Sequence, residues 1–196
     1  MEKPANTDHE IHDLLRRRWS PRAFSDRAVS REDLRRLIEA ARWAPSAMNE
    51  QPWRLLVATR EDSAEFARML ACLVPFNQRW AKNAPVLMLT VAQMAFAKNG
   101  KPNPHAWHDV GLAMATLTAQ ATALGLSVHQ MGGIDSGAIR ETYRIPEGYE
   151  PVTAVAIGYV GDPATLEEDL AERERAPRSR KPQAEIAFTA KWGRPL

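Results

Sequence analysis

Two stretches of the chain concentrate arginine. Four arginines and one serine lie between residues 16 and 22, and no acidic residue interrupts them. A second basic run lies near the end of the chain, at Arg173, Arg175, Arg178, Arg180 and Lys181. A guanidinium is planar, stays charged, and binds phosphate through two parallel hydrogen bonds. The two stretches indicate a phosphate site if the fold brings them together; otherwise each is a solvated face whose arginines pair with acids.

A polar loop bounded by prolines, residues 45–53, separates an expected helix from an expected strand. Its Ser46, Asn49 and Gln51 offer hydrogen bonds to a planar polar ligand, and loops at strand ends are common ligand sites. The same groups also suit a turn that hydrogen-bonds to its own backbone. The loop is therefore a candidate binding segment with a purely structural alternative.

A second candidate loop, M-G-G-I-D at residues 131–135, joins a strand to a helix. Gly132 and Gly133 allow close backbone approach, and their N–H groups suit a ring nitrogen or an anion. Turns also require glycine for steric reasons alone. The chain has neither the GxGxxG dinucleotide pattern nor the GxxxxGK[ST] phosphate loop, so ATP hydrolysis is not indicated.

Metal and nucleophile chemistry have little support. Two histidine pairs are spaced three residues apart, at His9 and His12 and at His105 and His108. Asp109 adjoins the second pair, but no third ligand is evident, so we predict no metal site. Cys72 lies in an apolar helical stretch and is expected to be an inert core thiol. No serine has a GxSxG setting, which gives no support for a hydrolase triad.

Composition limits the possible classes of protein. The 196 residues suit one domain, and 26 basic against 24 acidic residues give a net charge of only +2, which argues against a dedicated nucleic-acid binder. One cysteine excludes an intramolecular disulfide. The chain has no signal-type start and no apolar run of membrane-spanning length, so we expect a cytoplasmic protein without a membrane partner.

Hydrophobic periodicity predicts the elements that must position these residues. Helices are expected over residues 8–18, from Ser30 to before Pro45, and over residues 62–73, 105–124 and 135–143, with another from Asp162 that turns Leu166 and Leu170 inward. Strands are expected over residues 53–58, 86–92, 127–131 and 151–160, with a short one at 186–188. The helix at 105–124 is rich in small residues and is either a core or a subunit-contact helix. The pattern indicates a mixed α/β chain with helices on both faces of a sheet.

Four motifs, taken in order, resemble the FMN-dependent nitroreductase family. They are R-W-S-P-R-A-F at 18–24, A-P-S-A-M-N-E-Q-P-W at 44–53, G-L-S-V-H-Q-M-G-G-I-D at 125–135 and P-R-S-R-K-P at 177–182, and the ending K-W-G-R-P at 191–195 is also similar. The resemblance implies one domain over residues 1–196, with residues 1–8 flexible. It implies an α+β fold, with a central, mainly antiparallel sheet flanked by helices, and an intertwined homodimer with two FMN sites between the subunits.

The resemblance also assigns residues to FMN. The matching positions are Arg18, Trp19, Ser20, Arg22, Pro45, Ser46, Ala47, Met48, Asn49, Asn77, Met131, Gly132, Gly133, Arg178 and Arg180. The serine and arginines among them would hold the phosphate and ribityl chain, and Trp19 would contribute mainly its backbone. Asn77 would meet the pyrimidine edge, and the Gly132 N–H would bond to flavin N5. The loop at 45–49 would reach the flavin of the other subunit, and the helix at 105–124 would lie centrally in the dimer.

The implied activity is a ping-pong oxidoreductase in which NADH or NADPH reduces FMN. A small electron-poor acceptor, such as a nitroaromatic, quinone or enone, then takes the electrons. No catalytic side chain beyond the flavin is required. The alternatives are a relative specialised for dehalogenation or flavin breakdown, a non-enzymatic flavin-binding protein, and an arginine-rich module that binds RNA or an acidic partner.

Two departures from the family pattern bear on this expectation. Many relatives carry a lysine near flavin O2 where this chain has Trp80, so stabilisation of reduced flavin would fall more heavily on Arg22. The connection at residues 93–104 is short beside relatives with an aromatic lid, which leaves Phe96 and Trp107 to cover a substrate.

Overall fold

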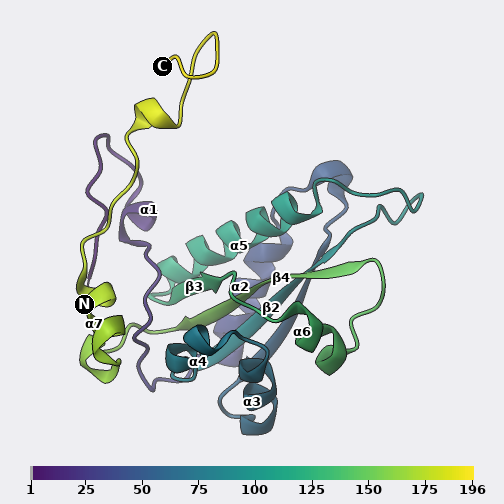
Figure 1. Cartoon of the computed structure of the whole chain (residues 1–196), viewed down its shortest axis with the longest axis vertical. Coiled ribbons are helices and arrows are strands. Elements are labelled where there is room, and N and C mark those ends of the chain that lie inside the picture. The colour runs from purple at the N-terminus through teal and green to yellow at the C-terminus, as the bar shows by residue number, and fades with distance from the viewer. Residues whose placement is uncertain (1) are drawn as a thin grey trace.

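A four-stranded antiparallel sheet forms the centre of the molecule (Figure 1). The computed structural model describes residues 2–196, and within them the strands pair in the order β1, β2, β4, β3. Their bounds are Trp53–Thr59 for β1, Val86–Gln93 for β2, Ser127–Met131 for β3 and Tyr149–Gly158 for β4. The four main predicted strands are confirmed to within two residues, and each pair is antiparallel. The predicted α+β class is therefore confirmed.

Helices cover both faces of this sheet. One face packs against α2 (Arg31–Arg42) and α5 (Ala106–Ala123), and the other packs against α3 (Ser63–Ala71), α4 (Pro75–Ala81) and α6 (Ser136–Tyr143). Alternate residues of β2 enter the two cores: Val86 and Met88 join the first, and Leu87 and Leu89 the second. A strand buried on both faces is apolar at nearly every position, and in β2 the buried Thr90 pairs its hydroxyl with that of Thr153.

Local capping chemistry agrees with the sequence patterns. The Ser30 hydroxyl accepts from Asp33 N at 2.9 Å and begins α2. The Asp135 carboxylate accepts from Ala138 N at 2.9 Å and begins α6. Gly125, with φ of +74°, directly follows the C-cap of α5. The Ser30 and Asp135 side chains satisfy N–H groups that a helix start leaves unpaired, and Gly125 N donates to Thr122 O at the end of α5.

The first helix is much shorter than predicted. It is α1 (Asp13–Arg17), capped by His12 and not by Asp8. None of its residues is buried, and Ile11 and Leu15 remain exposed. Because helical stability in proteins comes mainly from packing an apolar face, nothing holds further turns in place.

Three other segments differ from the prediction. The helix expected from Asp162 is divided into a short 3-10 turn, η2 (Pro163–Thr165), and α7 (Glu168–Arg175), because Leu166 between them is extended. Of the two leucines expected to face inward, Leu170 is buried and Leu166 is partly buried. The strand at 186–188 is wrong: η3 (Gln183–Glu185) precedes it, and Phe188 forms a single bridge with Pro195. Neither α4 nor the 3-10 turn η1 (Ala47–Asn49) was predicted.

The N-terminal segment is bonded to the body of the protein, whereas the C-terminal segment projects from it (Figure 1). Ala5 N donates to Arg16 O at 2.8 Å, which holds the start against the turn after α1. The C-terminal segment leaves the body beyond α7, as Figure 1 shows, and Trp192 is 90% exposed. Met1 lies outside the described residues, and the expected flexibility of residues 1–8 stays a prediction. No helix within residues 2–196 has the length and apolar character to cross a membrane.

Candidate functional site

The two arginine stretches meet at one cavity. Arg18, Arg178 and Arg180 line a space of about 310 Å³, together with Ala5 and Leu15. Other arginines of these stretches are engaged elsewhere: Arg16 and Arg17 pair with Asp13, Arg175 pairs with Glu168, and Arg173 lies over the ring of Phe76. The two stretches therefore meet through three residues, and their other arginines are paired or stacked elsewhere.

Positive charge is crowded at this cavity. Burial lowers the pKa of Arg18, and the charges of Arg178 and Arg180 lower it further. Burial and the charge of Arg180 likewise lower the pKa of Arg178. Within residues 2–196, no carboxylate forms an ion pair with any of these three guanidiniums. An anion bound here relieves the repulsion among like charges.

The three arginines are not equally free. Arg178 Nη1 donates to Lys3 O at 2.6 Å and to Arg16 O at 3.2 Å, so part of its guanidinium holds the N-terminal segment. Arg180 Nη1 bonds to the neighbouring Ser179 O. Arg18 Nη1 lies 3.4 Å from Ser20 Oγ. Arg18 and Arg180 therefore have more donors left for a ligand than Arg178 has.

Arg18 also connects this cavity to the end of β3. Arg18 and Ser20 line a second space of about 340 Å³, and Gln130 contributes to its wall. Gln130 precedes the buried Met131 and the Gly132–Gly133 turn. Strand β3 therefore links this second space, through Gln130, to the Gly132–Gly133 turn.

Arg22 does not line this cavity, and its side chain packs against Trp80. Its Nε is buried without a hydrogen-bond partner in the described residues, and its guanidinium carbon lies 6.0 Å from the centre of the Trp80 ring. Trp80 is fully buried, and its Nε1 likewise has no partner among those residues. Trp80 carries no charge, so the positive charge beside its indole ring is that of Arg22.

His129 covers the same indole. The two ring centres are 4.5 Å apart, and His129 Nδ1 donates to Pro21 O at 2.9 Å. Burial lowers the pKa of His129 to about 4, although the bond to Pro21 opposes the shift, and the charge of Arg22 lowers it further. The imidazole is therefore neutral at pH 7 and supports the turn between Arg18 and Arg22 through one hydrogen bond.

The glycine turn meets Asn77. Asn77 Nδ2 donates to Gly133 O at 3.0 Å, and Val74 N donates to the same oxygen at 3.2 Å. A Cβ at Gly133 would lie 2.6 Å from Asn77 Nδ2, so glycine is required there by close approach. A Cβ at Gly132 would meet nothing within 4 Å, and the Gly132 N–H makes no hydrogen bond to the described residues. One glycine is structural, and the other leaves a donor free beside open space.

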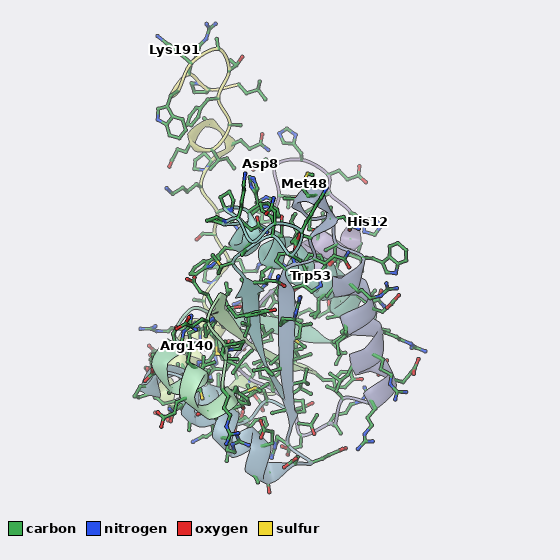
Figure 2. The ribbon with its side chains drawn as sticks, turned by 90° about the vertical axis from the view of Figure 1, so that its right-hand side faces the viewer. Asp8, His12, Met48, Trp53, Arg140 and Lys191 are labelled. Atoms are coloured by element: carbon green, nitrogen blue, oxygen red, sulfur yellow. The ribbon has the colours of Figure 1, made fainter. Side chains whose placement is uncertain are left out.

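The loop at residues 45–49 is separate from these groups. Ser46 Oγ accepts from Gln51 N at 3.0 Å, and Ala47 N donates to the buried Asp109 carboxylate at 3.0 Å. Met48 and Asn49 have φ of +54° and +56°, and Met48 is 87% exposed. In Figure 2, Met48 lies at the upper end of the body, well away from Arg140 of α6.

The length of α5 separates the loop from the arginine cavity. Asp109, which holds the loop, lies in the first turn of α5, whereas Arg18 lines a pocket with Thr122 near the last turn. Thirteen residues of α-helix span about 20 Å. One chain therefore does not bring Pro45, Ser46, Ala47, Met48 and Asn49 to the predicted phosphate site.

Comparison with known proteins identifies the family of this chain. A profile described as the Nitroreductase family matches residues 15–159. The chain belongs to this family. A crystal structure described as an oxidoreductase containing FMN is 38% identical, with a TM-score of 0.90 over 95% of each chain.

Two curated relatives extend the comparison. An uncharacterized 15.4 kDa protein of Mycolicibacterium smegmatis is 36% identical over 127 residues, which cover 65% of this chain and 84% of that protein. The FMN reductase [NAD(P)H] of Bacillus subtilis strain 168 is 28% identical over 171 residues, which cover 79% of this chain and 67% of that protein. Similarity to the Nitroreductase family therefore covers most of the chain.

The sequence analysis missed the supporting roles of two residues in this Nitroreductase-family chain. Glu174 is buried and accepts hydrogen bonds from the backbone N–H groups of Arg22 and Ala23. It lies in a run of alternating charges, but its spacing from the buried Leu170 places it on the inner face of α7. Asp109 was considered only as a metal ligand, and it holds the backbone of Ala47. In the part of the chain that the structure describes, no three metal-ligating side chains come together.

Proposed function

We propose that this chain is an FMN-dependent oxidoreductase that passes electrons from NADH or NADPH to a small electron-poor acceptor. A nitroaromatic, a quinone or an enone has the required chemistry. The observation that carries the proposal is the convergence of Arg18, Arg178 and Arg180 on one cavity, with no ion pair to a carboxylate among residues 2–196. The names of the similar proteins, which mention FMN and NAD(P)H, support the same cofactor and donor.

The residues present fit a flavin mononucleotide. Three guanidiniums and the Ser20 hydroxyl suit a phosphate dianion. The Gly132 N–H, unpaired among the described residues, suits an acceptor nitrogen of the ring system, and the Asn77 amide is bonded to the next residue, Gly133. In the same described part of the chain, Arg22 Nε is buried without a hydrogen-bond partner, beside Trp80. We propose that Trp19, between Arg18 and Ser20, contributes mainly its backbone, and that the buried Met131 supports the glycine turn that follows it.

FMN supplies the chemistry, because its ring accepts hydride from a nicotinamide and releases electrons to an acceptor. The chain's own residues bind the phosphate through Arg18 and Arg180 and present the Gly132 N–H to the ring. Arg22 provides positive charge in a desolvated setting, where electrostatic stabilisation of developing negative charge is strongest. No side chain of the site has to act as an acid or base. Phe96 and the half-exposed Trp107 lie at the same end of α5 as the loop at 45–49 and are proposed to cover the acceptor in the site of a second copy.

We also propose that the functional unit is a homodimer with sites between the subunits. Asp109, which holds the loop at 45–49, lies about 20 Å along α5 from Thr122, which lines a pocket with Arg18, so the loop would complete the site of a second copy. The exposed side of α5 carries Gly111, Ala115 and Ala119 at four-residue spacing, which allows another helix to approach closely. The projecting C-terminal segment exposes Trp192, which suits burial against a partner.

The proposal is tested by purification followed by anaerobic reduction. We expect yellow protein that releases FMN and not FAD on denaturation, elutes as a dimer, and loses its flavin absorbance when NADH or NADPH is added. Mixing the reduced protein with nitroaromatics, quinones and enones in a stopped-flow instrument then ranks the acceptors.

Each failure of this test has a separate meaning. A colourless protein that FMN does not reconstitute overturns the cofactor assignment, and a flavin-loaded monomer overturns the shared site. Bound flavin that neither nicotinamide reduces indicates a storage protein. Product analysis with halogenated substrates or free flavin identifies dehalogenation or flavin breakdown.

A further inference from the structure

The buried carboxylate of Glu174 joins the two basic segments from inside the protein. Its side chain is 1% exposed. Glu174 Oε1 accepts from Arg22 N at 2.9 Å and from Ala23 N at 3.1 Å, and Oε2 accepts from Arg22 N at 3.0 Å. These bonds connect α7 to a turn more than 150 residues earlier in the chain. They fix the backbone directly after Arg18 and Ser20.

A carboxylate is better suited to this position than an amide. It is acceptor-only when ionised, so both oxygens can receive backbone N–H groups without a competing donor. Hydrogen bonds to a charged acceptor are also shorter and stronger than neutral ones. Its negative charge attracts the Arg22 guanidinium, which would otherwise stand unpaired in the interior. A glutamine would keep one acceptor and turn an N–H₂ donor toward the Arg22 N–H.

The main chain around Glu174 is tied to the same region by Lys3. Lys3 Nζ donates to Glu174 O and Ala176 O, at 2.6 and 2.5 Å, and lies 5.2 Å from the centre of the Trp19 ring. Arg178, four residues after Glu174, donates back to Lys3 O. The end of α7, the N-terminal segment and the turn at residues 18–23 therefore form one connected unit.

We propose that Glu174 is a positioning residue that holds Arg18 in register with Arg180, so that the two basic segments act on a single phosphate. This inference rests on the proposed function, because it takes the anion to be the FMN phosphate. Glu174 does not contact the anion. It acts by fixing the turn that carries Arg18 relative to the segment that follows α7.

The test compares FMN with riboflavin, which differs by the phosphate alone. Apoprotein of the wild type, Glu174→Gln and Glu172→Gln is titrated with each flavin, and Kd is measured from fluorescence quenching. We expect Glu174→Gln to weaken FMN binding by about ten-fold and to change riboflavin binding by less than about two-fold. Glu172→Gln, the same change at an exposed carboxylate of α7, leaves both constants as in the wild type.

The comparison separates positioning from a merely structural role. A general loss of stability weakens both flavins together, so an equal loss for FMN and riboflavin overturns the proposal, as does an unchanged FMN constant. Combining Glu174→Gln with Arg180→Ala adds a second criterion. If Glu174 acts through the arginine pair, the two losses of FMN preference are less than additive; full additivity contradicts the proposal.

Failure of the proposed function gives a different result. Wild-type protein that binds FMN no better than riboflavin overturns the phosphate assignment itself, whatever the variants do. Should Glu174→Gln not fold, Glu174→Asp gives the same test, because it keeps the buried charge but shortens the side chain that reaches the N–H groups of Arg22 and Ala23. We then expect about a three-fold loss of FMN affinity with riboflavin unchanged, and no change overturns the proposal.

Discussion

The arginine cavity and the loop at residues 45–49 are built in opposite ways. The turn that carries Arg18 is held by Glu174 and by His129, and Lys3 holds the facing segment. The loop is supported from outside by Asp109, leaves Met48 exposed, and contains two residues with positive φ, Met48 and Asn49. Strained backbone persists where surrounding structure or function imposes it. One chain thus brings the three arginines of the cavity together by itself, and the exposed loop is the part that we propose to complete the site of a second copy.

Substitution of His129 tests how firmly the arginine region is held, and it has the largest expected effect. Burial lowers the pKa of His129 from 6.5 to about 4. Between these values the unfolded chain binds a proton that the folded chain does not. Well above pH 6.5, protonation of His129 therefore does not affect the free energy of unfolding. As the pH falls below 6.5 this free energy decreases, by about 3 kcal/mol at pH 4.

The measurement is the free energy of unfolding in urea at a series of pH values from 7 to 4. We expect His129→Gln to be less stable than the wild type at pH 7, but to lose about 3 kcal/mol less on acidification. His129→Phe, which also lacks the titrating group, provides a matched second variant. Parallel curves for the wild type and both variants would contradict the assignment of this pH dependence to His129.

Removal of one cavity arginine tests the anion site itself. Arg18→Ala deletes a charge-assisted contact to phosphate and is expected to weaken FMN binding by about 2 kcal/mol, roughly thirty-fold. Arg17→Ala is the control, since the guanidinium of Arg17 pairs with the exposed Asp13. Equal FMN affinities for the two variants, measured by titration of apoprotein, would show that the cavity does not hold the phosphate.

The same comparison explains what the sequence predicts well. Strands such as β2 are long apolar runs, and Ser30, Asp135 and Gly125 act on their immediate neighbours, so their roles are local. The convergence of the arginines depends on distant segments, and the family resemblance, not spacing, led to its prediction. Pairing of Arg16 and Arg17 with Asp13 shows that charge alone does not separate binding arginines from solvated ones.

Other features had a weak signal in the sequence or none. Helix α4 has seven residues and begins at Pro75, too few to display a period, although it places Asn77 against Gly133. Glu174 stands among other charges, and its burial depends on two backbone N–H groups contributed by a remote turn. The short α1 depends on an absence of packing partners, which periodicity does not report.

Substitution of Asp109, which supports the loop at residues 45–49, tests the loop in the same way. Asp109→Ala leaves Ala47 N without its buried acceptor and is expected to lower the free energy of unfolding by about 1.5 kcal/mol. Asp109→Asn keeps an acceptor oxygen for Ala47 N and is expected to cost less than half as much. If the loop completes the site of a second copy, Asp109→Ala also weakens FMN binding in the dimer. An FMN constant unchanged in Asp109→Ala would place the loop outside the site.

The smallest expected effect comes from relieving the strain at Met48. A methionine with φ of +54° is disfavoured, and Met48→Gly is expected to raise the free energy of unfolding of the dissociated chain by up to about 0.5 kcal/mol. Asn49→Gly is the matched change, and its gain is expected to be smaller because asparagine tolerates positive φ better. We expect Met48→Gly to weaken dimerisation, measured by sedimentation equilibrium, since it removes an exposed side chain that is proposed to contact the partner. Higher stability without any loss of dimerisation would show that the strained loop serves only its own chain.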